Sequence, residues 1–173
     1  MKKIIFGLFL IFCMSSCSYL FADSDLSDSK NKTEELLKYL DEKNTSEISF
    51  LFSHNAKSNI ADFNESIYEM IVYYDTSHKE LLDFISNTTK SNDYGKKIKT
   101  YTLSTNVDTL KGVYRLSIKW CVEDDFDSNN VGIQSLYIIK LEDDIYPEYT
   151  YWGDGLWSNG INIGKVWSEN QSE

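Results

Sequence analysis

Histidines are the first residues to test for catalysis or metal binding, and this chain has two, His54 and His78. Each lies among polar neighbours, and neither has a second histidine or a cysteine at metal-ligand spacing. The sequence also lacks a phosphate-binding glycine loop, a nucleophile elbow and a zinc motif. We therefore predict that both histidines are surface residues, and we predict no catalytic residue, no metal site and no cofactor.

An acidic run imitates the first ligands of a calcium loop, with Asp125, Asp127 and Asn129 at alternate positions. However, Asn130 stands where that loop needs glycine for its sharp turn, and Leu136 stands where it needs a bidentate glutamate. The pattern therefore predicts a solvated hairpin loop.

Aromatic residues crowd the C-terminal region, where glycines interrupt them. Rings beside acids and amides can stack on a sugar or an apolar ligand and orient it by hydrogen bonds. The candidate ligand or partner surface consists of Tyr149, Tyr151, Trp152, Asp154, Trp157 and Asn159. The alternative, which we favour, is that these rings close the wide end of the domain while the glycines make turns.

Cys17 offers a different chemistry. The order Met14-Ser15-Ser16-Cys17 is similar to the bacterial lipobox, in which the thiol is thioether-linked to diacylglycerol before the signal peptide is removed. Two lysines and an apolar run precede it, as in a secretory signal peptide, and the run is too short for a transmembrane helix. An ordinary signal peptide cut near Ala22 is the alternative. We predict a lipoprotein signal peptide over 1–16 and lipidation of Cys17, which would anchor the chain to a membrane of the bacterial cell envelope.

The rest of the chain divides simply. Residues 17–31 are rich in serine and aspartate and predict a flexible tether. Residues 32–168 predict a single domain of ordinary size, and 169–173 a C-terminal tail. The formal net charge of −10 argues against nucleic acid as a partner, since such binding needs clustered basic residues. It weakly favours a basic or neutral partner.

Cys121 is the only other cysteine of the predicted mature chain. It follows a run of alternating apolar residues, where a lone thiol is far more often a small buried hydrophobe than a nucleophile. With Cys17 acylated, an intramolecular disulfide is excluded, so stability must come from packing.

Helical patterns come first along the chain. Residues 33–40 open with acidic residues and carry a buried leucine stripe, and 48–53 predict a second, short helix. A third begins at Asp62, which with Glu65 predicts a capping box. Its buried face is predicted from helical spacing and consists of Phe63, Ile67, Met70, Ile71 and Tyr74.

Strand patterns follow from residue 81. The ambiguous run 81–85 is taken as a first strand, and 97–103, 113–122 and 131–141 alternate as half-buried strands do. Two more strands are predicted, one including Tyr149 to Trp152 and a short one at 161–163. Helices in front and antiparallel strands behind predict an α+β domain.

This order resembles the cone-shaped nuclear-transport-factor-like (cystatin-like) fold, in which helices precede a curved antiparallel sheet. More specifically, the chain resembles a family of bacterial lipoproteins grouped as domain of unknown function 5104. The resemblance lies in residues 50–53, 62–74, 130–138, 152–155 and 160–163. It implies a fold and an envelope location, and brings no catalytic residues. The polar stretch 86–94 departs from it, which leaves the strand register there open.

Three functional classes remain. The first is a non-catalytic envelope lipoprotein that binds a small ligand or a protein partner. The second is an immunity or inhibitor protein against a basic partner, which small size, acidity and a lipid anchor suit. The third is a cavity enzyme of the isomerase or dehydratase type, an analogy from the fold alone. We rank them in this order.

Overall fold

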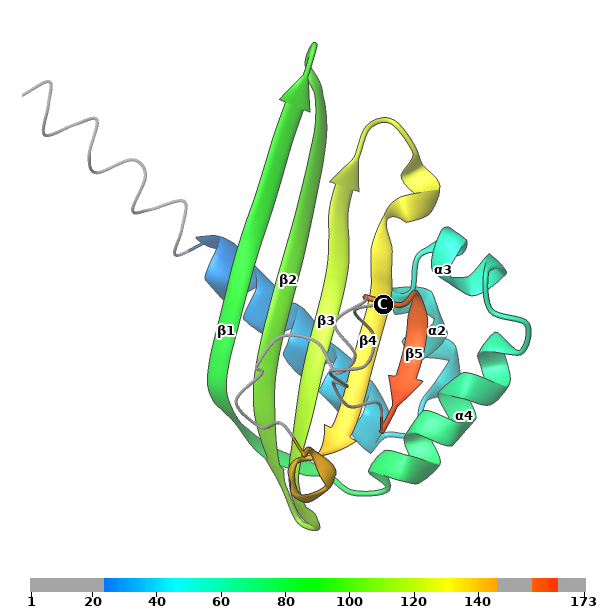
Figure 1. Cartoon of the computed structure of the whole chain (residues 1–173), viewed down its shortest axis with the longest axis vertical. Coiled ribbons are helices and arrows are strands. Elements are labelled where there is room, and N and C mark those ends of the chain that lie inside the picture. Colours follow the sequence, from blue (N-terminus) through cyan, green and yellow to red (C-terminus); the bar gives the residue numbers. More distant parts are fainter. Residues whose placement is uncertain (1–23, 146–156, 165–173) are drawn as a thin grey trace, which may run out of the picture.

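The computed structural model describes residues 24–145 and 157–164. The fold is α+β, with helices at the N-terminus and one open, mostly antiparallel sheet in the strand order β1-β2-β3-β4-β5 (Figure 1). Several predicted features lie outside the described residues, namely the signal peptide, Cys17, the C-terminal tail, the strand at 149–152, and the site residues Tyr149, Tyr151, Trp152 and Asp154.

The strands are β1 (His78–Asp93), β2 (Lys96–Thr109), β3 (Gly112–Asp124), β4 (Gly132–Lys140) and β5 (Gly160–Ile163). The first four form an antiparallel meander. β5 pairs in parallel with β4, which corrects the prediction of an antiparallel strand there. A parallel neighbour requires the chain to return to the other end of the sheet, and the long connection before β5 allows this.

β1 is much longer than its apolar pattern predicts. The predicted strand 81–85 is only its first part, and the polar stretch that left the register open continues it to Asp93. Among the described strands, β1 lies at the edge and pairs only with β2, so few of its side chains need to be apolar. This explains why hydrophobic alternation did not reveal it.

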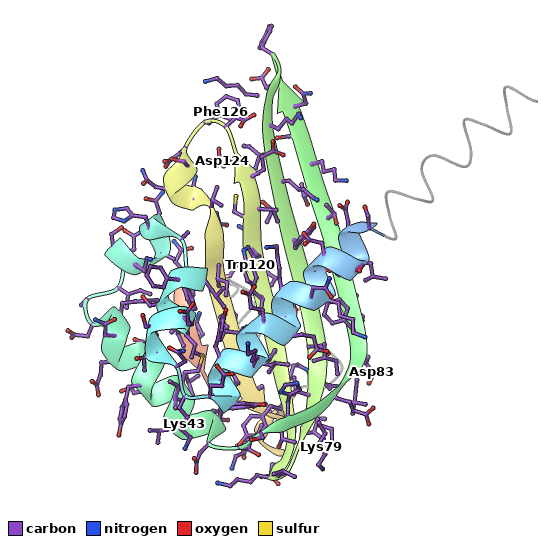
Figure 2. The ribbon with its side chains drawn as sticks, turned by 180° about the vertical axis from the view of Figure 1, so that it is seen from behind. Lys43, Lys79, Asp83, Trp120, Asp124 and Phe126 are labelled. Carbon is purple, nitrogen blue, oxygen red and sulfur yellow. The ribbon has the colours of Figure 1, made fainter. Side chains whose placement is uncertain are left out.

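The N-terminal helix covers residues 24–41 and crosses one face of the sheet obliquely (Figures 1 and 2). Residues 24–31, predicted as part of a flexible tether, are therefore helical. The buried face of this helix begins with polar side chains, so the hydrophobic pattern did not predict its first turns. Ser29 and Thr33 are buried and donate their hydroxyl hydrogen bonds back to helix carbonyls, so burial leaves neither unpaired.

Three further helices follow, α2 (Thr45–Leu51), α3 (His54–Ser58) and α4 (Phe63–Tyr74). The predicted helices at 48–53 and 62–74 are confirmed with shifted ends, whereas α3 was not predicted. The predicted buried face of α4 is confirmed residue by residue. The capping box is wrong: Asp62 is the N-cap residue, but its side chain makes no capping hydrogen bond.

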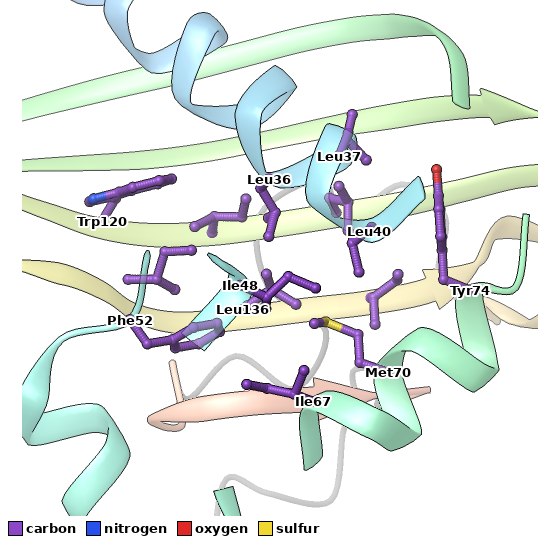
Figure 3. Packing of buried hydrophobic residues seen from close by; sticks show 14 of the residues in the cluster. Leu36, Leu37, Leu40, Ile48, Phe52, Ile67, Met70, Tyr74, Trp120 and Leu136 are labelled. Atoms are coloured by element: carbon purple, nitrogen blue, oxygen red, sulfur yellow. The ribbon is translucent and has the colours of Figure 1, made fainter. Parts of the chain in front are cut away.

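The core lies between the helices and one face of the sheet (Figure 3). The N-terminal helix contributes Leu36, Leu37 and Leu40, all at most 1% exposed. They pack over cross-strand rows of mostly apolar side chains, since residues paired across a sheet share a face. These inner rows are Leu103–Ile118–Leu136–Ile161 and Thr105–Leu116–Ile138–Ile163.

Gly132 allows the end of α2 to contact the start of β4. Its φ is +123°, and a Cβ atom there would lie 2.5 Å from the backbone nitrogen of Ser53. Ser53 in turn donates its N–H to the carbonyl of Ile133, and Phe52 forms an isolated bridge to the same residue. The close approach of two backbones therefore requires glycine at this position.

We expect Gly132→Ala to lower the free energy of unfolding more than Gly112→Ala. Both glycines have a φ of +123°, which L residues rarely adopt, so both variants carry backbone strain. A Cβ at Gly112 meets open space, whereas at Gly132 overpacking adds about 1–3 kcal/mol. Urea unfolding of the two variants measures the difference, and equal midpoints would contradict the steric argument.

Asp75 connects three elements by hydrogen bonds, at the end of the sheet where the β2–β3 turn lies. It follows α4, and its carboxylate accepts hydrogen bonds from Lys43 (2.7 Å) after the N-terminal helix and Lys111 (2.8 Å) in the β2–β3 turn. The hydrogen bond from Lys111, followed by that from Lys43, lowers the pKa of Asp75 to about 2. The group is exposed, so its effect on stability is small.

The pKa of Asp75 predicts an acid-dependent loss of this connection. Its folded pKa is below the ordinary value of about 3.9. Its stabilising contribution is therefore complete above about pH 4 and is lost as the pH falls toward 2. A carbon-detected NMR titration of the side-chain carboxyl should show a midpoint near 2. In the Lys43→Gln, Lys111→Gln double variant the midpoint should return toward the ordinary value, and an unchanged midpoint there would refute the assignment.

Candidate binding face

The face of the sheet that points away from the N-terminal helix is polar. Strand alternation turns every second cross-strand row to this side. One such row runs across four strands as Ser104, Ser117, Tyr137 and Asn162, and the hydroxyls of its two serines lie 3.3 Å apart. We call this surface the polar sheet face, and it consists of Thr102, Ser104, Asn106, Arg115, Ser117, Lys119, Ser135, Tyr137 and Asn162.

The side chains of the polar sheet face differ in their exposure to solvent. Ser104 and Ser117 are each 3% exposed, and Ser135 is fully buried. Thr102 and Lys119, in the neighbouring row, are half-buried. The face therefore combines a buried polar interior with a margin that solvent reaches.

Arg115 is the only arginine of the chain, and it lies on this face. Its Nη1 is 2.6 Å from Oδ2 of Asp144, which follows the short helix η2 (Leu141–Asp143), and both side chains are 9% exposed. Its Nε donates to the side-chain oxygen of Asn106 at 3.3 Å. A buried guanidinium requires such partners, because its removal from water is costly when unpaired.

Trp157 brings an aromatic ring to the same face. The ring lies edge-on to that of Tyr137, with centroids 6.0 Å apart. The backbone there is held by hydrogen bonds, since Ser135 donates to the carbonyl of Trp157 and the N–H of Ser158 donates to the Tyr137 hydroxyl. Of the two predicted site residues in the described part of the chain, Trp157 therefore joins this face, whereas Asn159 is exposed in a bend before β5.

Sequence reasoning missed the strand residues of this face. The alternation of β2 to β4 identifies its apolar half as core, but it assigns no role to the polar half. Arg115 carried the best signal, because a single arginine inside an apolar-alternating strand has to find a buried partner.

His78 corrects the prediction that both histidines are surface residues. Its side chain is only 21% exposed and lies between two carboxylates of the N-terminal helix. Nδ1 is 2.8 Å from Asp41, and Nε2 is 3.3 Å from Glu34. The backbone N–H of His78 also donates to Asp41, so this cluster attaches the start of β1 to the helix.

The acidic loop between β3 and β4 is a hairpin loop, as predicted. Its carboxylates are occupied by the protein itself: Asp124 accepts from the backbone of Phe126 and Asp127, and Asp125 accepts from the backbone of Lys97. The Asn130 amide is the largest cause of the lowered pKa of Asp124. Within 24–145 and 157–164, no cluster of three acidic, histidine or cysteine residues could hold a metal ion.

Cys121 is buried and free, which confirms its prediction as a small hydrophobe. Burial raises the pKa of its thiol, as does the nearby charge of Asp124. A thiol that is buried and protonated is a poor nucleophile.

In the part of the chain that the structure describes, no helix is both long and apolar enough to cross a bilayer.

The comparison with protein families gives a clear result. The family described as Domain of unknown function (DUF5104) matches residues 35–141, more than half of the chain. The chain therefore belongs to this family, and the predicted resemblance to domain of unknown function 5104 is confirmed. The match begins inside the N-terminal helix and ends after β4, so it includes most of the polar sheet face. No curated protein matches the chain.

We expect Arg115→Met to lower the free energy of unfolding by about 3–5 kcal/mol, because it leaves the buried Asp144 carboxylate without this partner. The double variant Arg115→Met, Asp144→Leu should recover most of this loss, since it removes both charges. The exposed pair Lys79–Asp108 is a matched control, and Lys79→Met should cost less than about 1 kcal/mol. A double variant no more stable than the single one would show that the pair is not coupled.

Proposed function

We propose that this protein is a lipid-anchored lipoprotein of the bacterial cell envelope, whose domain binds a ligand non-catalytically at the polar sheet face. The anchor is Cys17, supported by the lipobox-like order ahead of it and the signal-peptide pattern. One observation carries the binding proposal: the half-buried side chains of Thr102, Asn106 and Lys119 share one sheet face with the half-buried ring of Trp157.

The chemistry of this face suits a carbohydrate-bearing ligand. Sugars present hydroxyls that both donate and accept hydrogen bonds, and the half-buried side chains of Thr102 and Asn106 can do the same. They also present apolar C–H surfaces that stack on aromatic rings such as that of Trp157. Thr102 and Lys119 form the margin where such a ligand would first make contact, because they are only half-buried.

The arrangement supports binding over catalysis. The inner face of the sheet, where a cavity enzyme of this shape would hold its acid, carries apolar rows against the helices.

We further propose that the fold is of the nuclear-transport-factor-like (cystatin-like) type. Helices that precede a meander of long strands support this assignment. Register shifts within β1–β2, β2–β3 and β3–β4 also support it, because bulges bend a sheet.

An inhibitor of a basic partner is the second candidate, favoured by the net charge of −10. A partner of this kind would bind by charge and would be released by salt. Carbohydrate binding through hydrogen bonds and ring stacking would be far less sensitive to salt.

A thermal-shift screen of the chain from Ser18 onward tests the binding proposal with sugars, cell-wall fragments, lipids and divalent metals. A ligand at one hundred times its dissociation constant adds about 2.7 kcal/mol of stability, which raises Tm by roughly 10 °C. We expect a carbohydrate to produce this shift and Trp157→Ala to abolish it. Tyr68→Ala, which removes an exposed ring from α4, is the control and should leave the shift intact. If no carbohydrate shifts Tm, the ligand class is wrong.

A further inference from the structure

The turn between β1 and β2 contains a residue type that is uncommon in such turns. Asp93 pairs with Lys96, so Tyr94 and Gly95 form a two-residue turn, and both have positive φ, +49° and +86°. Such a turn favours asparagine, aspartate or glycine, and a bulky aromatic residue in the left-handed region is uncommon. The side chain of Tyr94 is also fully exposed, so packing within the described chain does not compensate for the strain.

Lysines are close to Tyr94 in the sequence. Residues 90–99 contain four lysines and one acid, Asp93, in a chain whose net charge is −10. Lys96 and Lys97 follow the turn directly and are exposed. Lys96 also lies 4.9 Å from the ring of Phe126, a second exposed aromatic residue.

The hairpin projects beyond the rest of the sheet. Figure 1 shows the β1–β2 turn extending past the acidic β3–β4 loop, and Figure 2 shows Asp124 and Phe126 in that loop beside the hairpin. The carboxylates of Asp124 and Asp125 accept backbone hydrogen bonds below the turn. The part that would first meet a surface is therefore the tyrosine and its lysines, which we call the hairpin tip (Tyr94, Lys96 and Lys97).

The start of the N-terminal helix is held beside this hairpin. Asp25 is buried and accepts hydrogen bonds from Lys90 and from Lys99 (2.7 Å). Burial raises the pKa of Asp25, but the two lysines outweigh burial and lower it overall, so the contact is ionic at neutral pH. Nearby, Tyr101 donates to Asp28 at 2.7 Å.

These contacts limit how far the tip lies from the predicted anchor. Tyr94 is four positions after Lys90, which is about 13 Å along the strand. The chain from Cys17 to Ser24 spans at most about 25 Å when fully extended. An acyl chain on Cys17 would therefore keep the hairpin tip within reach of lipid headgroups.

We propose that the hairpin tip docks on the anionic phospholipid surface of the membrane that holds the lipid anchor. This inference rests on the proposed lipidation of Cys17. Tyrosine is favoured at the boundary between headgroups and acyl chains, and lysine can bury its stem while its ammonium group stays with phosphates. Docking would orient the domain, with the opposite β2–β3 turn away from the membrane.

The test uses the full chain, produced in a bacterium that acylates lipoproteins and reconstituted in vesicles of phosphatidylcholine and phosphatidylglycerol. A fluorophore on Ser91→Cys reports on the hairpin, and one on Leu110→Cys reports on the opposite turn as the matched control. Cys121 is buried and should not take the label. We expect a quencher attached to the lipid chains to reduce emission from the hairpin probe and to leave the control probe unchanged.

Variants of the tip separate docking from folding. Tyr94→Asn places a residue that the turn favours, so it should keep or raise stability while reducing the quenching. Lys96→Gln with Lys97→Gln should weaken docking on the order of thirty-fold, because each lysine near an anionic surface contributes about 1 kcal/mol. Vesicles of phosphatidylcholine alone should have the same effect as this double variant.

Flotation of the vesicles distinguishes a failure of the lipid-anchor proposal from a failure of the docking proposal. If the chain does not float with vesicles, or if Cys17→Ala floats equally well, the lipid anchor is wrong and the docking inference falls with it. If the wild-type chain floats through Cys17 but both probes are quenched equally or not at all, the anchor stands and docking of the hairpin tip is overturned.

Discussion

The packing of the N-terminal helix across the sheet is the constraint on which the remaining structure depends. Its leucine stripe and the inner rows of β2 to β4 form most of one core, and each leucine buried there contributes about 1.5–3 kcal/mol. A helix and a sheet that are each apolar on one face bury those two faces against each other. The helix also determines which face of the sheet is inside, and hence which half of every strand is left for other uses.

The polar sheet face follows from that division. Once the helices occupy one side, the alternate residues of the same strands point to the other side. There the chain places serines, asparagines and its single arginine in cross-strand rows. The Arg115–Asp144 pair and the hydrogen bonds to the 157–158 backbone give this face a specific geometry rather than a general polarity.

The N-terminal helix also connects the two ends of the domain. At its start, Asp25 and Asp28 contact the β1–β2 hairpin, and near its end Asp41 holds His78 at the beginning of β1. The helix therefore fixes β1 at both ends, although β1 is an edge strand with few apolar residues. The same contacts hold the start of this helix beside the β1–β2 hairpin.

The sequence by itself determined the elements whose signal is local. The face of α4, the alternation of β2 to β4 and the burial of Cys121 all follow from residue type and spacing, because each depends on hydrophobic periodicity along a few turns or strand residues. The helix over 24–31 and the far half of β1 could not be predicted, since their residues are polar and their partners, Lys99 and β2, are distant in sequence. Only the tertiary structure decided that Arg115, Trp157 and the serines of β2 and β3 share one face, that β5 runs parallel to β4, and that His78 is held between two helix carboxylates. The physical reason is the same in each case: these relations depend on strand register and on how the helix crosses the sheet, which no short stretch of sequence specifies.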